Sequence, residues 1–344
     1  MKILVTGADG LLGSNIVRAL LGADHRVRAF VQPGRDASTL AGLDIELARG
    51  DLLDRSSLHQ AAEGVDAIVH AAASTSVWPA RSELVRRINI DGTKAALDAA
   101  KIAQVRRFVH IGSAAAFGPG TLESPGDETR PYAGSRWKLD YVDSKASGQA
   151  LVLDAARKGD VPALVLAPTF MLGPWDSGPS SGKMLLSVAA DRVPGASPGG
   201  KCYVAVRDAA RCVLRAMETG EIGESYIVGA RNMNYAEAFT LISSVAASLG
   251  PKIGLAGCRA RTYRPLPKAA VLAAGAAGSV YGALTGKAPQ VSYAMARIAC
   301  SCEYYSGARA ARAFGIEWTP IESAVEEAFL WFAERGYLKH PRHP

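Results

Sequence analysis

The chain has 344 residues, of which 49% are hydrophobic and 21% charged, and this composition is typical of a globular protein with an ample core. The formal net charge of +7 comes from scattered arginines rather than from a basic patch, so we expect no nucleic-acid partner. The five cysteines show no zinc-like spacing, and no metal site is expected. An odd cysteine count and a first strand that starts at residue 3 favour a cytoplasmic protein.

The first apolar run, residues 3–5, leads into a glycine-rich turn and then into helical apolar spacing over residues 15–20. A strand, a glycine-rich turn and a helix form half of a dinucleotide-binding unit. Gly7 allows the tight turn, Gly10 lets the backbone approach a pyrophosphate, and Gly13 lets the helix pack close to the strand. The free N–H groups at the start of the helix favour an anion there.

Strands and helices alternate through the first half of the chain. This alternation predicts an α/β fold, a Rossmann-type doubly wound parallel sheet with helices on both faces. We expect residues 1–173 to form an NAD(P)-binding domain and residues 174–344 a smaller, mostly helical substrate-binding lobe, interleaved with the first and without a linker. The expected strands are 27–31, 45–48, 67–70, 107–111 and 163–167, and the expected helices 82–103 and 138–157.

The second half predicts fewer strands. Asp208 is expected to cap a helix that runs through Glu218, and Asn234 with Glu237 resembles a capping box. Two or three helices are expected after Pro267. The other expected elements are a loop over 175–182, a helix over 183–191, strands over 202–206 and 226–228, and C′ glycines at Gly315 and Gly336.

Residues 269–286 carry no charge and are mostly Ala and Gly. Their length is close to that of a membrane span. The small side chains favour a packed or substrate-covering helix, and peripheral membrane contact through 267–286 is the alternative.

Ligands bind at the carboxyl ends of parallel strands, so the residues that follow each expected strand are site candidates. Asp51 can accept a hydrogen bond from an adenine amino group or can be a simple turn residue. His70 is expected to be a buried, hydrogen-bonded histidine. The small residues 71–73 leave room for a ribose or a nicotinamide, and Ser113 follows the next strand along the chain.

Tyr141 and Lys145 are four residues apart, so they share one face of a helix. A free tyrosine has a pKa of about 10, and a nearby ammonium lowers it toward neutrality. A serine hydroxyl from another strand end can hydrogen-bond a carbonyl oxygen where charge develops. This combination suits proton exchange during hydride transfer.

Together, the glycine turn, Asp51, the HAAA sequence at 70–73, Asn89, Ser113 and the YxxxK motif at 141–145 resemble the extended short-chain dehydrogenase/reductase superfamily. The resemblance implies that Ser113, Tyr141 and Lys145 carry catalysis, with Asn89 supporting the active-site helix and its water. It also implies a homodimer with a two-helix contact. The expected cofactor-binding residues are Gly7, Gly10, Leu11, Leu12, Gly13, Arg35, Asp51, Leu52, Ala71, Ala72, Ala73, Tyr141, Lys145, Pro168, Thr169 and Phe170.

The sequence APTFMLGP at 167–174 departs from the R-x-x-N-x-x-G-P pattern of sugar-nucleotide epimerases and dehydratases. Ala167 and Phe170 stand where that pattern has arginine and asparagine. The stretch is similar to the dihydroflavonol reductase and 3β-hydroxysteroid dehydrogenase branch, which includes hopanoid-associated and sterol decarboxylase-type proteins. This branch, with the apolar residues Phe170, Met171 and Trp175, implies a hydrophobic substrate.

The resemblance therefore implies an NAD(P)-dependent oxidoreductase that interconverts a secondary alcohol and a ketone on a sterol- or terpenoid-like molecule. Decarboxylation would follow if the product is a β-keto acid. A sugar-nucleotide epimerase or dehydratase is the alternative. Val31 stands where NAD-binding members carry an acid, and Arg35 is a candidate partner for a 2′-phosphate, so NADP is favoured over NAD.

Overall fold

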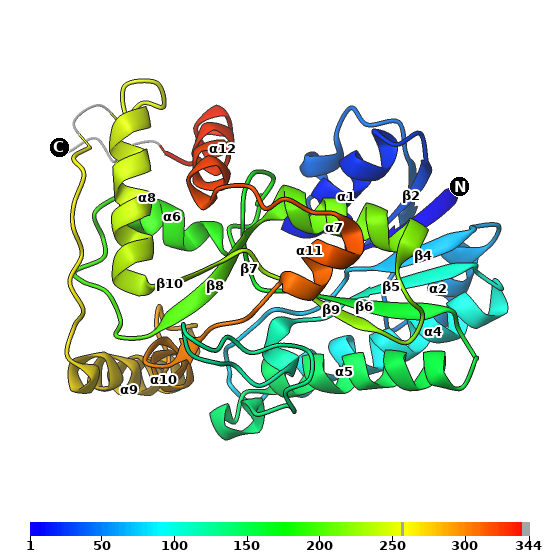
Figure 1. Ribbon diagram of the computed structural model, residues 1–344, viewed down its shortest axis with the longest axis horizontal. Coiled ribbons are helices and arrows are strands. Elements are labelled where there is room, and N and C mark those ends of the chain that lie inside the picture. Colours follow the sequence, from blue (N-terminus) through cyan, green and yellow to red (C-terminus); the bar gives the residue numbers. More distant parts are fainter. Residues whose placement is uncertain (256–257, 339–344) are drawn as a thin grey trace.

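The computed structural model describes residues 1–255 and 258–338, which form two lobes, each built around a β-sheet (Figure 1). The last residues of the expected substrate lobe, 339–344, lie outside this range. The larger sheet contains only parallel pairs, in the order β3-β2-β1-β4-β5-β6-β9, which confirms the predicted doubly wound parallel sheet. Its strands are β1 (Lys2–Thr6), β2 (Arg26–Val31), β3 (Glu46–Arg49), β4 (Ala67–His70), β5 (Arg107–Ile111), β6 (Ala163–Pro168) and β9 (Ser225–Val228).

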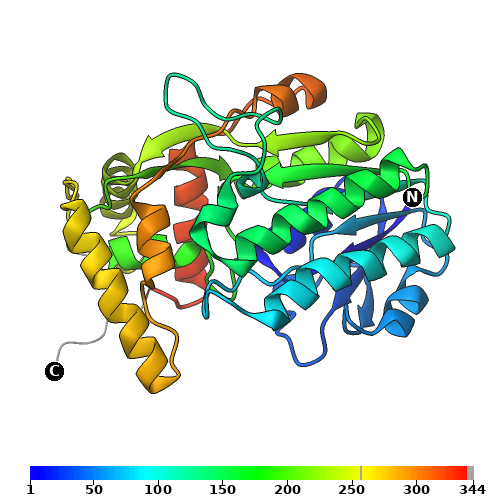
Figure 2. The same ribbon diagram turned by 90° about the horizontal axis from the view of Figure 1, so that it is seen from below.

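Helices cover both faces of the larger sheet, so its central strands are apolar on both sides (Figures 1 and 2). In β1, Ile3 and Val5 belong to the core under α1 and α7, whereas Leu4 belongs to the core under α2 and α4. The helices of this lobe are α1 (Leu11–Leu21), α2 (Arg55–Ala62), α4 (Gly92–Ile102), α5 (Asp140–Arg157), α7 (Val206–Thr219) and α11 (Ala308–Phe314). Thus α7, β9 and α11, all beyond residue 173, complete the larger lobe.

The smaller lobe has a four-stranded sheet in which β8 pairs with all three other strands. These strands are β7 (Phe170–Leu172), β8 (Gly200–Ala205), β10 (Arg231–Asn234) and β11 (Cys302–Glu303). A separate apolar core joins this sheet to α6 (Gly182–Ala189), α8 (Tyr235–Leu249) and α12 (Ile321–Glu334). The predicted capping box of α8 is present, since Asn234 and Glu237 cap each other's backbone N–H.

Three details differ from the sequence-based expectations. The helix expected over 82–103 is divided into α3 (Glu83–Arg86), a π-helical turn η2 (Arg87–Asp91) and α4. The helix expected from 138 starts at residue 140, because Lys138 has a left-handed φ of 51°. Up to residue 338, four helices rather than two or three follow Pro267: α9 (Lys268–Thr285), α10 (Tyr293–Ala299), α11 and α12.

The expectation that Asp208 caps a helix is wrong. β8 runs directly into α7, which begins at Val206, so Asp208 already lies in its first turn. Its fully buried carboxylate accepts hydrogen bonds from the Thr319 backbone N–H (2.7 Å) and hydroxyl (3.0 Å). Asp208 therefore fixes the segment that leads into α12.

The uncharged stretch forms α9, which packs along α10 (Figure 2). Glycines lie on the packed face: a Cβ at Gly275 would stand 2.5 Å from Ala296, and a Cβ at Gly282 would stand 2.5 Å from Trp78. The opposite face is exposed. Among the described residues, none of the helices combines the length and apolar character needed to cross a membrane.

Candidate active site

The glycine turn joins β1 to α1 and packs too closely for side chains. Gly7 has a φ of 66°, and a Cβ there would lie 2.7 Å from Ala72 Cα. A Cβ on Gly13 would lie 2.0 Å from the Gly7 carbonyl oxygen, so the helix rests directly on the turn. Gly10 is different, since a Cβ there would meet only the Gly7 oxygen, at 3.4 Å. The tight turn at Gly7 and the close helix packing at Gly13 are therefore present, and the open space at Gly10 is compatible with the predicted approach of a pyrophosphate.

The other small residues expected near the cofactor lie beside this turn. Ala71, Ala72 and Ala73 follow β4 and are part-buried, and Ala71 donates its N–H to Thr6 O at 3.3 Å. At the start of α1, Leu11 is part-exposed and Leu12 is buried. Backbone, rather than charged side chains, thus forms this part of the site.

At the ends of β2 and β3, the polar residues are paired with each other. Asp51 accepts hydrogen bonds from Gln32 Nε2 (3.1 Å) and from the Leu53 N–H (2.9 Å), and the adjacent Leu52 is buried. Arg35 is 62% exposed and its Nε lies 3.2 Å from a carboxylate oxygen of Asp9, a residue of the glycine turn. The structure therefore brings Arg35 to the turn, with Asp9 as its partner.

Asn89 lies in the π-helical turn and holds two segments at once. Its Oδ1 accepts from the Ser74 N–H (2.7 Å), and its Nδ2 donates to Ser74 O (3.0 Å) and to Ser144 Oγ (2.9 Å). Ser144 in turn donates to Tyr141 O (3.0 Å). Asn89 thus links the segment after β4 to the helix that carries Tyr141. Ser144 stands beside Lys145 in the motif, but its role was missed because the linkage depends on tertiary contact.

His70 is buried and hydrogen-bonded, as expected. Its Nδ1 lies 2.9 Å from Thr6 Oγ1 and its Nε2 lies 3.3 Å from Thr93 Oγ1, and burial lowers its pKa to about 3. Thr93 uses its hydroxyl proton on Asn89 O (2.8 Å), so His70 Nε2 must be the protonated nitrogen. Thr6 then donates to Nδ1 and accepts from the Ala72 N–H (3.2 Å). A continuous chain of hydrogen bonds, each with a defined donor and acceptor, therefore connects β1 to Asn89.

Tyr141, Lys145 and Ser113 converge at the carboxyl end of β5. Lys145 is buried and its Nζ donates to Ile111 O at 2.6 Å. Burial lowers the pKa of Lys145 to about 8. Ser113 lies two residues beyond Ile111, where its Oγ accepts from the Ala115 N–H (3.3 Å).

The expectation that Lys145 lowers the pKa of Tyr141 needs correction. Burial raises the pKa of Tyr141 above its ordinary value, and hydrogen bonding with Ser113 opposes this shift. The Lys145 ammonium is directed instead to the Ile111 carbonyl. In this structure burial therefore favours the protonated phenol, and Ser113 is its hydrogen-bonding partner.

The apolar cluster expected after β6 is divided. Side chains alternate along β7, so Phe170 faces Tyr203 (ring centroids 5.6 Å apart), whereas Met171 packs against the core under α1. Trp175 lies between Arg18 and Trp331. Met171 and Trp175 thus pack against the two cores, and Phe170 stays a candidate for contact with a hydrophobic substrate.

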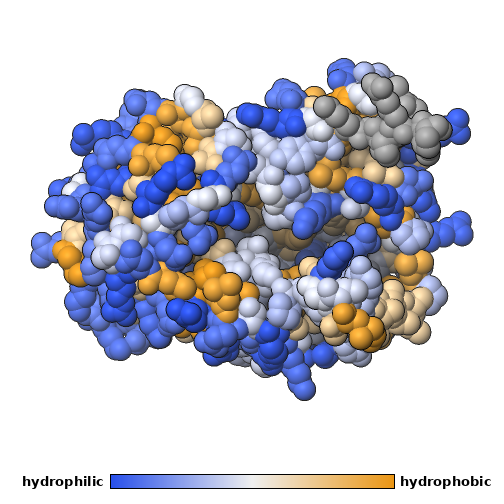
Figure 3. Space-filling model, turned by 180° about the vertical axis from the view of Figure 1, so that it is seen from behind, coloured by the Kyte–Doolittle hydropathy of each residue, from blue (hydrophilic) through white to orange (hydrophobic). Residues whose placement is uncertain are grey.

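Pro168 ends β6 and is buried, and Thr169 is held by its neighbour β9. The Thr169 N–H and hydroxyl both donate to Val228 O, at 2.9 and 3.2 Å. These contacts fix the backbone that leads to Phe170, where the chain passes from the larger to the smaller lobe. Seen from behind, the surface is hollowed near the centre of the molecule (Figure 3).

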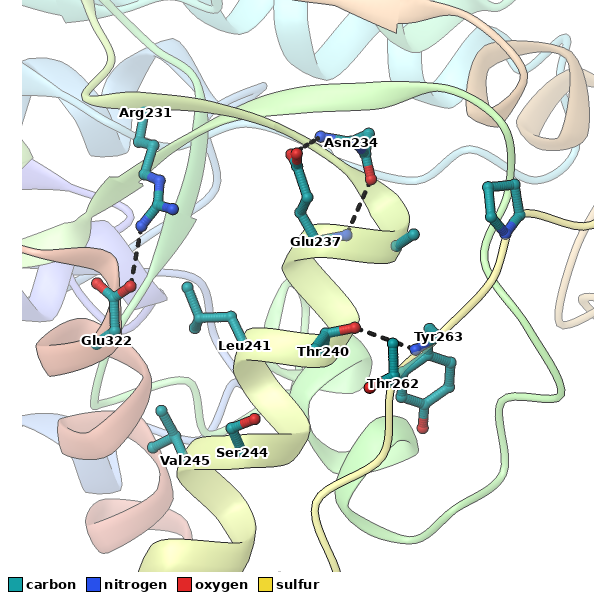
Figure 4. Close-up of a pocket in the computed structure, with 12 residues that line it drawn as sticks. Arg231, Asn234, Glu237, Thr240, Leu241, Ser244, Val245, Thr262, Tyr263 and Glu322 are labelled. Atoms are coloured by element: carbon teal, nitrogen blue, oxygen red, sulfur yellow. Dashed lines mark hydrogen bonds and ion pairs between the residues drawn. The ribbon is translucent and has the colours of Figure 1, made fainter.

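A separate open groove of about 690 Å³ lies along α8 (Figure 4). Arg231 and Glu322 pair across one side of it (2.9 Å), and Thr240 Oγ1 accepts from the Tyr263 N–H (3.0 Å) on the other. Neither Ser113 nor Tyr141 lines this groove, so it is distinct from the site at β5.

Comparison with known proteins agrees with this architecture. Residues 3–229 match the model of the NAD dependent epimerase/dehydratase family. The chain is 32% identical to "Sterol demethylase protein B" of Methylococcus capsulatus, over 98% of this chain and 100% of that protein. It is 28% identical to a "Putative dihydroflavonol 4-reductase" of Synechocystis, over 97% and 95% of the two chains. The solved structure of gox2253 superposes with a TM-score of 0.82 at 30% identity, and covers 98% of this chain and 99% of that one.

The family match covers well over half of the chain, and the sterol-related relative aligns along its full length. This chain therefore belongs to the NAD dependent epimerase/dehydratase family and is an extended short-chain dehydrogenase/reductase enzyme of the branch predicted from its sequence.

Proposed function

We propose that this enzyme interconverts a secondary alcohol and a ketone on a hydrophobic, sterol- or terpenoid-like substrate. The observation that carries the proposal is the convergence of Tyr141, Ser113 and buried Lys145 at the end of β5. The relative named "Sterol demethylase protein B" supports the hydrophobic class, as does the part-buried Phe170 at the lobe boundary.

The proposed mechanism assigns one task to each group. NAD(P), when bound, accepts or supplies the hydride. Tyr141 exchanges the proton of the substrate oxygen, and Ser113 donates a hydrogen bond to that oxygen as charge develops on it. Lys145, whose Nζ is held by the Ile111 carbonyl, binds ribose hydroxyls. Asn89 positions the Tyr141 helix through Ser144. The residues proposed to hold the cofactor lie in the glycine turn, at the start of α1 and at or after the ends of β2, β3, β4 and β6. They are Gly7, Gly10, Leu11, Leu12, Gly13, Arg35, Asp51, Leu52, Ala71, Ala72, Ala73, Pro168, Thr169 and Phe170, together with Tyr141 and Lys145.

If the substrate carries a carboxylate on the carbon next to the carbinol, oxidation gives a β-keto acid. The bond to the carboxylate then breaks, carbon dioxide leaves, and the electron pair passes to the ketone as an enolate that takes up a proton. One site would thus perform both oxidation and decarboxylation.

A substrate panel tests the proposed class. We expect NAD(P)-dependent oxidation of a 3β-hydroxysteroid and no turnover or tight binding of UDP-glucose. Epimerisation of UDP-glucose without net cofactor reduction would instead favour the sugar-nucleotide alternative, which the family name includes. Calorimetry with UDP and dTDP would detect nucleotide binding directly.

We propose NADP as the preferred cofactor, because β2 ends in Val31 without an acid and Arg35 lies beside the turn. Replacing Arg35 with alanine should lower kcat/KM for NADP about 10-fold, since a guanidinium–phosphate contact is lost. The value for NAD should change less than two-fold. Equal losses with both cofactors, or a wild-type preference for NAD, would contradict the assignment.

We also propose that α9 contacts a membrane surface. Its outer face exposes Val280 (59%), Tyr281 (53%) and Leu284 (82%), and Lys268 and Lys287 stand at its two ends. The lower right of Figure 3, over α9, shows the uncharged surface that results. Exposed apolar groups between lysines suit an anionic bilayer interface.

Co-sedimentation with phosphatidylglycerol vesicles measures this contact. Leu284→Glu should reduce the bound fraction several-fold, because a charge replaces the most exposed apolar side chain of the helix. Leu84→Glu, at another exposed leucine (58%), is the matched control and should bind like wild type. Equal binding by all three proteins would exclude α9 as the contact.

A further inference from the structure

A charged cluster lies next to the proposed catalytic groups and belongs to none of the predicted motifs. Lys201 on β8 and Glu303 on β11 are register partners in parallel strands, so their side chains leave the sheet on the same face. Arg136, in the turn η4 (Gly134–Trp137) shortly before the Tyr141 helix, places its guanidinium 3.8 Å from Glu303 Oε1. Three distant parts of the chain thus meet at one point.

This cluster approaches the proposed active site through two contacts, one at Phe170 and one at Tyr305. The Lys201 ammonium lies 4.7 Å from the centroid of the Phe170 ring, the residue that follows Thr169 at the end of β6. Tyr305 OH lies 3.3 Å from Glu303 Oε2 and 3.5 Å from Phe117 O. Phe117 and Tyr305 pack with Ala114, the residue after Ser113. The cluster is therefore one side-chain layer away from the Ser113 loop.

The charges of the cluster do not cancel. Lys201 and Arg136 supply two positive charges, and Glu303 supplies one negative charge. Among the described residues, the Lys201 ammonium forms neither a hydrogen bond nor an ion pair, and buried Glu303 Oε1 lacks a hydrogen-bond partner. Burial lowers the pKa of Lys201, which Glu303 opposes, and burial raises the pKa of Glu303, which Arg136 opposes most. An ammonium that lies over an aromatic ring without an anionic partner can form an ion pair with an anionic group of a ligand.

We propose that Lys201, with Arg136, forms a subsite for a carboxylate on the substrate, close to the oxygen handled by Tyr141 and Ser113. This inference rests on the proposed oxidoreductase function and narrows its substrate class to hydrophobic hydroxy acids. Phe170 contacts the apolar frame of the substrate beside the carboxylate. Glu303 holds Arg136 in place and limits the attraction of both cations for anions. Specificity for an acid over a neutral alcohol therefore comes from Lys201.

The test compares a 3β-hydroxysteroid 4-carboxylic acid with its methyl ester. The wild-type enzyme should prefer the acid, and Lys201→Met should lower kcat/KM for the acid about 10- to 100-fold, the effect of one charge-assisted hydrogen bond. The ester should change less than two-fold. Lys201→Arg should restore most of the preference. Equal losses for acid and ester, or no preference in wild type, would overturn the subsite.

If neither steroid is oxidised, the proposed function is contradicted, but the subsite is not. A direct binding measurement then tests the subsite. The 3β-hydroxysteroid 4-carboxylic acid, measured as a ligand by calorimetry, should bind at least 10-fold more weakly to Lys201→Met than to wild type. Glu303→Gln should bind it more tightly, since a negative charge is removed. If the cluster were purely structural, both substitutions would weaken binding of the ligand. Lys94→Met, at an exposed lysine of α4, is the matched control. Loss of UDP binding in Lys201→Met, with binding of the steroid acid unchanged, would assign the subsite to a diphosphate and overturn the carboxylate.

Discussion

Replacing Tyr141 with phenylalanine should reduce turnover about 10³-fold while the affinity for the cofactor stays within two-fold of wild type. The variant keeps the ring and loses the single hydroxyl that lies beside Ser113. Proton exchange with the substrate oxygen then has no donor or acceptor, whereas the glycine turn and Lys145 are unchanged. Steady-state kinetics and a fluorescence titration with reduced cofactor measure the two effects separately.

Tyr132→Phe provides the matched control for this experiment. Tyr132 lies nine residues before Tyr141, and its hydroxyl donates to Asp143 rather than facing Ser113. Its loss should change turnover only a few-fold. Near-normal turnover of Tyr141→Phe, or an equal loss in both variants, would remove Tyr141 from the mechanism.

Gly13→Ala should destabilise the protein by about 3 kcal/mol and abolish measurable cofactor binding. The new Cβ would stand 2.0 Å from Gly7 O and 2.8 Å from Ala8 Cα. Both are backbone atoms that cannot rotate away, so α1 must move off β1 and its N-terminus leaves the site. Denaturant unfolding gives the stability change, and calorimetry with NADP gives the affinity.

Gly10→Ala separates cofactor binding from folding at the same turn. Gly10 has a φ of −77°, which alanine adopts, and its Cβ would meet only Gly7 O at 3.4 Å. Stability should stay within 1 kcal/mol of wild type, or about the effect of an ordinary surface substitution. Cofactor affinity should fall about 10-fold, because the methyl group occupies the space in which the pyrophosphate would lie against the backbone. Unchanged affinity in this variant would show that the turn does not hold the pyrophosphate.

The larger sheet could be predicted because its signals are local. Each buried strand is a short apolar run, and the glycine turn specifies its own backbone geometry through Gly7 and Gly13. The same holds for the α8 capping box, where Asn234 and Glu237 lie three residues apart. Local sequence therefore determined which elements form and in what order.

What the sequence could not predict depends on contacts between distant residues. The charged cluster joins Arg136, Lys201 and Glu303, which are separated by more than 60 residues at each step, and β11 is only two residues long. Asp208 follows the helix-cap pattern, yet its partner is Thr319. Trp175 resembles a substrate contact in sequence and instead packs on Arg18. In each case, the contacts of the side chain come from residues that are distant in sequence, so the local sequence could not predict them.

Transfer of deuterium from reduced cofactor labelled at nicotinamide C4 tests the central claim most directly. With a 3-ketosteroid as substrate, we predict one deuterium at the carbinol carbon of each alcohol formed, and a rate reduced about 10³-fold in Tyr141→Phe. Absence of label in the steroid, together with redox-neutral epimerisation of UDP-glucose by the same preparation, would contradict the account.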